Sequence, residues 1–260
     1  PMNGFTTPRR EGVPENCLAV DLIHRAVKRL FEGDQEEGPV APQIKVINLS
    51  IGDPTRQFAQ AMSPLARLLD WLSVKYGVLF IVSAGNHPES ISLGVSRTEF
   101  TALPADEFEA VTIKALYRDA RNRRLLSPAE TINGISVGAV HSDEAQVAYQ
   151  GNRIEPFVHL LPSPVSAFGS GYRRAIKPDI IFYGGRQWYR EHLPSTDPVT
   201  IETVNYCIAP GNKVASPGKF SGEFRKPPLR RRKNKLTALT SRAAGICLVS
   251  SQEIFKDPHC

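Results

Sequence analysis

The sequence predicts an α/β fold in which helices flank a mostly parallel sheet, within a single domain over residues 1–260. Three observations predict this fold: short apolar runs rich in branched residues, amphipathic helical segments between them, and a strand, helix, strand order. With 41% hydrophobic and 22% charged residues, the 260 residues have ordinary globular composition and can bury one large core.

The first predicted helix covers residues 14–33, where apolar side chains recur at the spacing of one helix face and Gly33 acts as a stop. After an acidic loop, residues 45–52 read KVINLSIG, a short run typical of a buried parallel strand. Val46 and Ile47 are expected to lie in the core.

Further helices and strands alternate along the chain. Residues 63–77 repeat the helical pattern, and residues 77–86, GVLFIVSAGN, predict a second buried strand that ends in small residues. A charged helix follows over residues 105–124, then a third strand candidate within 131–140 and a fourth within 177–185. From about residue 185 the pattern weakens.

Composition argues against several classes of protein. No run of eighteen apolar residues occurs, and the first twelve residues hold no apolar segment, so we expect neither a membrane span nor a secretory signal, and a cytoplasmic location. The four cysteines form no CxxC pair, so we expect no zinc site or disulfide scaffold, and no metal or cofactor is predicted.

Five short stretches carry a resemblance to a known family. They are NLSIG (48–52), SAGN (83–86), INGISVGAV (132–140), SAFGSGYRRAIKPDI (166–180) and APG (209–211). In this order and spacing they resemble the subtilisin-like serine proteases, the subtilases, over about residues 19–255. The resemblance implies peptide or protein substrates, hydrolysis through an acyl-enzyme, and a three-layer fold with a mostly parallel sheet.

The resemblance also implies roles for individual residues. The family's strand at NLSIG lines the cleft and pairs with the substrate as an added strand, and Asn86 matches the amide that stabilises the oxyanion. The small residues before Asn86 would allow close approach of the substrate backbone. A core strand and a simple turn are the structural alternatives. The substrate-binding positions are thus Leu49, Ser50, Ile51, Gly52, Ser83, Ala84 and Gly85.

Two members of the family's catalytic triad have no matching motif. No Asp-Ser-Gly or Asp-Thr-Gly occurs, and none of the six histidines is followed by glycine. Asp21 and His24 lie one helical turn apart, but this helix matches one that follows the family's histidine motif. We therefore expect an amino-terminally truncated subtilase domain that lacks the strands bearing those motifs.

The serine motif is disrupted as well. Residues 240–244 fit Thr-Ser-x-Ala-x, which makes Ser241 a possible nucleophile, but Leu239 and Gly245 replace the expected glycine and proline. A second register resembles a bacterial subtilase subgroup, matches residues 237–244 and places the nucleophile's position at Asn234. An asparagine amide cannot act as the nucleophile.

A window of cations and prolines, residues 224–236, separates two matching regions, and we interpret it as a local frame change. The favoured hypothesis is a subtilase domain that is inactive as this chain. One alternative is a peptidase that uses Ser241 once a missing amino-terminal segment completes it. Another is a non-enzymatic protein whose basic run, residues 225–235, binds nucleic-acid phosphates. Because no aromatic residue is interleaved in that run, nucleic acid is the least favoured partner.

Overall fold

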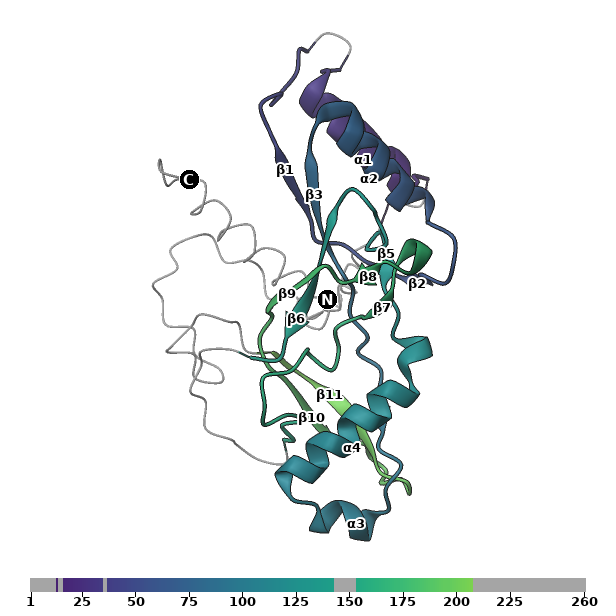
Figure 1. Ribbon diagram of the computed structural model, residues 1–260, viewed down its shortest axis with the longest axis vertical. Helices are drawn as coiled ribbons and strands as arrows, with labels where there is room; N and C mark the ends of the chain where they lie inside the picture. Colours follow the sequence, from purple (N-terminus) through teal and green to yellow (C-terminus); the bar gives the residue numbers. More distant parts are fainter. Residues whose placement is uncertain (1–12, 14–15, 35–36, 143–152, 208–260) are drawn as a thin grey trace, which may run out of the picture. The chain divides into compact units, whose positions relative to one another are not determined.

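The structure is a computed structural model that describes residues 13, 16–34, 37–142 and 153–207 (Figure 1). The chain divides into two compact units, residues 1–44 and residues 45–260. The single domain over residues 1–260 therefore stays a prediction.

In the part of the first unit that the structure describes lies one helix, α1, from Ala19 to Phe31. Val27 is its buried residue, and Gly33 follows the helix with a φ of +86°, a left-handed conformation that suits glycine. The chain then returns along the helix end, where the Ala41 N–H donates to the Leu30 carbonyl at 3.0 Å. The helix predicted from the sequence is thereby confirmed, two to five residues shorter at each end.

The centre of the second unit is a four-stranded parallel sheet in the order β1-β3-β6-β9 (Figure 1). Asn48 of β1 pairs with Ile81 of β3, Ser83 of β3 with Val137 of β6, and Val140 of β6 with Tyr183 of β9. All four predicted strands are present and parallel. Their bounds are Val46–Leu49 for β1, Leu79–Ser83 for β3, Ile135–Val140 for β6 and Ile180–Tyr183 for β9.

Burial differs between the central and the outer strands of this sheet. Phe80, Val82 and Val137 in β3 and β6 are fully buried. By contrast, Val46 of β1 is 37% exposed and Ile47 is only half-buried, so the core position expected for Val46 is wrong. Within the described residues β1 pairs with a neighbour on one side only, which leaves its other edge without a strand.

The predicted helices of this unit are also found. Helix α2 runs from Pro64 to Tyr76, begins where the Ser63 side chain accepts the Ala66 N–H at 3.1 Å, and ends at Gly77 with φ +60°. It contacts β3 and buries Leu65, Ala66, Leu69 and Leu72. Helix α4 runs from Ala105 to Arg118 and is followed by the short 3₁₀ turn η1, Ala120–Asn122.

A three-stranded antiparallel sheet was not foreseen from the sequence. It has the order β10-β11-β4, with β4 at Ile91–Ser92, β10 at Gln187–Glu191 and β11 at Thr200–Cys207. Helix α4 lies beside β10 and β11 in Figure 1, and its Phe108 and Leu116 share a buried cluster with Tyr189 and Ile201. The short helix α3, Arg97–Ala102, precedes α4 and begins with a capping box of Ser96 and Glu99.

Two small antiparallel pairs complete the described elements. Strand β2, Asp53–Gln57, pairs with β5, Leu126–Ser127, and β7, Gly169–Ser170, pairs with β8, Ile176–Lys177, across the 3₁₀ turn η2, Tyr172–Arg174. A second buried cluster gathers next to β5, from Phe58, Ala84, Leu125, Ala129 and Ala167.

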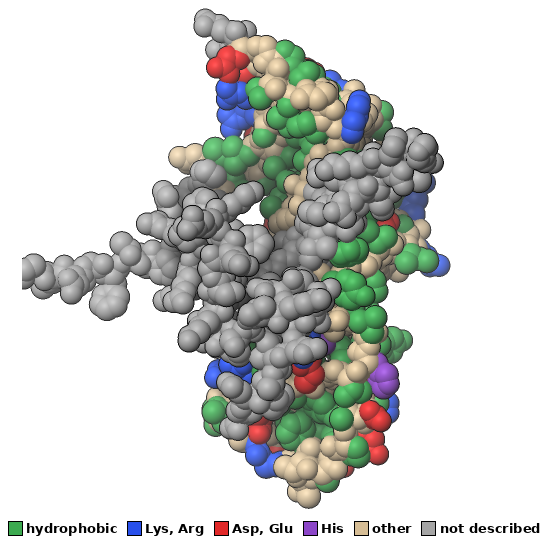
Figure 2. Space-filling view, turned by 90° about the vertical axis from the view of Figure 1, so that its left-hand side faces the viewer, with side chains coloured by type: hydrophobic (Ala, Val, Ile, Leu, Met, Phe, Trp, Pro, Cys, Tyr) green, Lys and Arg blue, Asp and Glu red, His purple; other side chains and the backbone are tan. Residues whose placement is uncertain are grey.

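The surface of the described residues is mixed. Figure 2 shows hydrophobic side chains that reach the surface between lysine, arginine and acidic ones. Exposed apolar residues include Ile176 at 88% and, on β9, Ile181 at 48%. Among the helices described here, no segment is both long enough and apolar enough to cross a membrane.

Candidate functional site

Two of the predicted site segments follow neighbouring strands at the same edge of the sheet. Strand β1 ends at Leu49 and β3 ends at Ser83, and the two strands are parallel partners. The carboxyl ends of parallel strands meet at one edge, which is where open α/β sheets bind ligands. Residues 50–52 and 84–86 therefore leave the sheet side by side.

Gly52 and Gly85 lie close to each other in these segments. A Cβ atom built on Gly52 would lie 3.6 Å from the Cα atom of Gly85 and 3.4 Å from the Cβ atom of Leu126. One built on Gly85, whose φ is +109°, would lie 2.5 Å from the Cγ atom of Leu126. Gly85 therefore has no room for a side chain, whereas a Cβ atom on Gly52 would make ordinary van der Waals contacts with Gly85 and Leu126.

Asn86 follows Gly85 and is held by its backbone. It forms a β-bridge with Ser166, while the His87 N–H donates to the Val165 carbonyl at 2.7 Å and the Ala167 N–H donates to the Gly85 carbonyl at 3.0 Å. The residue is 8% exposed. Because the backbone on both sides of Asn86 is fixed, the place from which its amide side chain leaves the chain is fixed too.

Arg123 fixes the same segment from beneath. Its side chain is 1% exposed, and its Nε atom donates to the Asp119 carboxylate at 2.9 Å. The two remaining nitrogens donate to four backbone carbonyls, those of His87 and Pro164 at 3.3 Å each, Glu89 at 3.3 Å and Ser90 at 3.4 Å. Sequence reasoning missed this residue because it stands in a run of arginines that reads as a solvated surface.

The segment after β1 has a tight local conformation. The Ile51 N–H donates to the Leu49 carbonyl at 2.9 Å, and the Ser50 hydroxyl donates to the Asn48 side chain at 2.9 Å. The Ile51 side chain is 41% exposed. Because this exposed apolar side chain lies just beyond the end of β1, it offers contact area to a ligand.

The four histidines of this unit that lie in the described ranges are engaged in structural contacts. His87, next to Asn86, is 2% exposed, with its Nε2 atom 2.7 Å from the Arg124 carbonyl. His141 accepts the Gln187 N–H at Nδ1 (3.3 Å) and meets Glu155 through Nε2 at 2.5 Å, which fixes its tautomer. His159 and His192 pair with Glu109 and Glu202.

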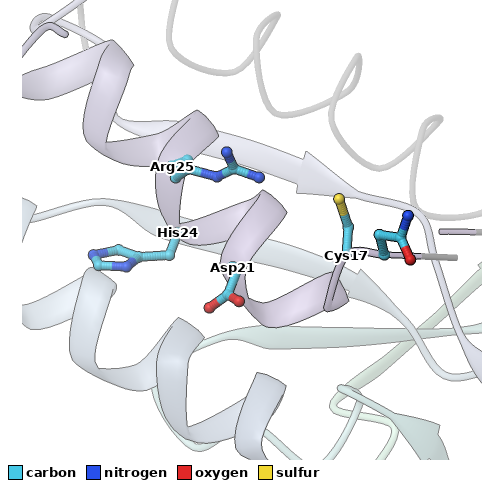
Figure 3. Close-up of a pocket in the computed structure, with 5 residues that line it drawn as sticks. Cys17, Asp21, His24 and Arg25 are labelled. Carbon is cyan, nitrogen blue, oxygen red and sulfur yellow. The ribbon is translucent and has the colours of Figure 1, made fainter. Parts of the chain in front are cut away.

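Asp21 and His24 lie on α1 in the first unit. Figure 3 shows them around a shallow pocket lined by Asn16, Cys17, Asp21, His24 and Arg25, with the imidazole and the carboxylate pointing in different directions from the helix. This arrangement does not form the hydrogen-bonded acid and base of a catalytic triad.

Asp179 ties β9 to β6 below the site. Burial raises the pKa of this carboxyl, but hydrogen bonds from Lys177 and Ser136 outweigh burial and hold the pKa below its usual value. The Lys177 Nζ atom lies 2.6 Å from the carboxylate, and the Ser136 N–H and hydroxyl donate at 2.6 and 2.8 Å. Asp179 is therefore a charged structural link.

The predicted nucleophile positions lie outside the described residues. These positions are Ser241 and Asn234. The window 224–236, the basic run 225–235 and the family stretch at 209–211 also lie outside the described residues. Over the described ranges, no group of three or more histidine, cysteine, aspartate or glutamate side chains is arranged to hold a metal ion.

Comparisons with known proteins identify a family for this chain. The model of the subtilase family matches residues 17–217 of the chain. A protein of Sinorhizobium fredii (strain NBRC 101917 / NGR234), described as "Uncharacterized protein y4bN", is 32% identical over 145 residues. The match covers 54% of this chain and 31% of that protein, so the chain spans about a third of the length of the relative it matches.

Proposed function

This chain belongs to the subtilase family, and on that premise we propose that residues 49–52 and 83–86 form the peptide-binding edge of a serine-peptidase domain. An extended peptide pairs with residues 49–52 as an added strand. The amide side chain of Asn86 donates a hydrogen bond to the carbonyl oxygen of the peptide bond that would be cleaved.

The proximity of Gly52 to Gly85 is the observation that supports the proposal. A Cβ atom built on Gly52 would lie 3.6 Å from the Cα atom of Gly85, so the segment proposed to pair with a peptide lies next to the one that holds Asn86. Two glycines allow a peptide backbone to approach without a side chain in the way.

We further propose that the chain binds peptides but does not cleave them by itself. The 260 residues contain no Asp-Ser/Thr-Gly or His-Gly motif, and the histidine nearest Asn86, His87, is buried against a backbone carbonyl. Acyl transfer requires a nucleophile, a base and an orienting group together. In the favoured register Asn234 occupies the nucleophile's position and supplies none of these.

A second candidate function is supported by the sequence around Ser241. Thr240, Ser241, Ala243 and Ala244 fit the family's serine motif, so a separate segment that supplies the aspartate and the histidine would yield a peptidase. Labelling of Ser241 by a fluorophosphonate probe in the presence of such a segment, and loss of the label in Ser241→Ala, would favour this function over the first.

Backbone-methylated peptides test strand addition directly. A labelled unstructured peptide is titrated with the chain by fluorescence anisotropy, and N-methyl groups are placed at successive residues. Since alternate N–H groups of an added strand face the protein, methylation at one set of alternate positions removes about two hydrogen bonds and weakens binding by roughly tenfold.

Methylation at the intervening positions serves as the control and is expected to leave binding within about threefold. Equal loss at every position, or no binding of any peptide, would contradict the proposal. In the same samples the peptide should stay intact. Cleavage that disappears in Ser241→Ala would contradict the proposed lack of activity.

A further inference from the structure

Leu126 occupies the gap between the two segments of the peptide-binding edge. Its Cγ atom lies 2.5 Å from the position of a Cβ atom on Gly85, and its Cβ atom lies 3.4 Å from one on Gly52. The residue is 3% exposed. Its isobutyl group thus lies against both glycine α-carbons, where a side chain of a bound peptide would otherwise fit.

The backbone of Leu126 is fixed on both sides. Its N–H donates to the Ala84 carbonyl at 3.0 Å, and its own carbonyl accepts the Ala129 N–H at 2.9 Å. In the small antiparallel pair, Leu126 is opposite Gln57 and Ser127 is opposite Asp53. These contacts link Leu126 to the strand after Gly52 and to the segment before Gly85, so they fix the place from which its side chain enters the gap.

A peptide bound as proposed must direct one side chain towards this gap. The residue whose carbonyl oxygen faces Asn86 carries its side chain on the Cα atom bonded to that carbonyl carbon. Its side chain therefore lies beside Asn86, between residues 50–52 and 84–86. With the isobutyl group already there, the remaining room suits a hydrogen atom or a methyl group.

We infer that Leu126 limits the peptide residue next to the polarised carbonyl to glycine or alanine, so that the substrates of this edge are peptides with small residues at that position. This inference rests on the proposed peptide-binding function. In a hydrophobic pocket a change of one methylene alters binding or turnover by ~10–200-fold, so the discrimination is measurable.

Peptides that end at the critical residue form the probe. Four labelled, alanine-rich peptides carry Gly, Ala, Leu or Phe at the free carboxyl end, where the terminal carboxylate supplies the oxygen for Asn86. Anisotropy titrations with the full chain are expected to show the Gly and Ala peptides bound at least about tenfold more tightly than the Leu and Phe peptides.

Leu126→Ala is expected to abolish or reverse this preference. The Leu and Phe peptides gain roughly tenfold or more in affinity, whereas the Ala peptide changes by less than about threefold. Leu126→Val removes less side-chain volume, so the Leu and Phe peptides are expected to gain affinity by a smaller factor. This variant keeps the test usable if the alanine variant does not fold. Leu125→Ala is the matched control, because Leu125 is an equally buried leucine next in the chain whose atoms are not among those nearest to a Cβ atom on Gly52 or Gly85.

The outcomes separate the two claims. If the peptides bind and neither Leu126 variant changes their order, or if Leu125→Ala changes it equally, the inference is overturned while the proposed function stands. If none of the four peptides binds, the proposed function fails and the inference fails with it. A loss or reversal of the preference that is confined to the Leu126 variants supports both.

Discussion

Gly52 and Gly85 face each other across neighbouring strand ends, and a Cβ atom on Gly52 would lie 3.6 Å from the Cα atom of Gly85. Gly85 has a φ of +109°, and Gly52 precedes β2 directly. The two glycines join the predicted strand-pairing segment to the predicted oxyanion segment, so changes there should affect stability and peptide binding together.

Gly85→Ala is expected to lower the free energy of unfolding by about 2–6 kcal/mol. A positive φ near +109° strains any residue with a side chain, by ~1–3 kcal/mol, and the added methyl group would overlap Leu126, at a further ~1–3 kcal/mol. Urea titrations followed by circular dichroism measure the change.

Gly77→Ala provides the control for Gly85→Ala. Gly77 also has a positive φ, +60°, but a Cβ atom there would have no neighbour within 4 Å, so only the backbone cost of ~1–2 kcal/mol is expected.

Adding Leu126→Ala to Gly85→Ala should recover about 1 kcal/mol or more relative to additivity, since the overlap is removed. Strict additivity would show that Leu126 and Gly85 do not touch in solution.

Arg123→Met is expected to destabilise the second unit by about 3–5 kcal/mol. The change leaves four carbonyls, from residues 87, 89, 90 and 164, without their buried donor and removes the partner of Asp119. Arg123→Lys should recover only part of the loss, because an ammonium cannot replace the planar fork. The exposed Arg121→Met should stay within ~0.5 kcal/mol. Equal effects of Arg121→Met and Arg123→Met would contradict this role.

The parallel sheet was predictable because its strands carry a strong local signal. Residues 46–49, 79–83, 135–140 and 180–183 are short apolar runs separated by helices or glycines, and all four form strands. The antiparallel strands β10 and β11 were missed, since residues 187–191 (QWYRE) and 200–207 (TIETVNYC) are neither continuous apolar runs nor strictly alternating, and Pro194 and Pro198 lie between them.

The candidate site was predictable only in part. The resemblance of NLSIG and SAGN identified the two segments, and their parallel strands imply that they meet at one edge. Nothing local identified Leu126 or Arg123, because each acts through partners about 30 to 75 residues away, such as Gly52 and Ser90. The arginine that is buried among residues 118–124 is the one that reaches the backbone carbonyls of residues 87, 89, 90 and 164, and the local sequence does not identify it.

Stability should fall on acidification through Asp179. Its pKa in the folded chain is below the usual 3.8, because hydrogen bonds from Lys177 and Ser136 outweigh the opposing effect of burial. A depressed pKa contributes stability that is present above the unfolded value and lost as the pH falls through the folded value. Urea midpoints should therefore decline below about pH 4.

Asp179→Asn should flatten this decline and lower stability at neutral pH. Asp197→Asn removes a carboxylate from an exposed loop and should leave the pH dependence unchanged. An unchanged decline in Asp179→Asn would show that other carboxylates control the acid response.

Asn86→Asp is expected to weaken peptides with a free terminal carboxylate by roughly tenfold or more, because a donor to an anion is replaced by a like charge. Asn86→Ala should weaken the same peptides through loss of the donor alone. Terminal amides of the same sequences should be affected less. Anisotropy titrations check this, and equal losses for carboxylate and amide peptides would argue that Asn86 does not face the carbonyl.

Nuclear magnetic resonance of the ¹⁵N-labelled chain during titration with an alanine-terminated peptide tests the peptide-binding edge most directly. The account predicts that the Gly52 and Gly85 backbone amides and the Asn86 side-chain amide shift together and saturate at one peptide concentration, while Gly77 and Gly94 do not move. If the peptide binds and these three signals stay unchanged, residues 49–52 and 83–86 are not the peptide-binding edge.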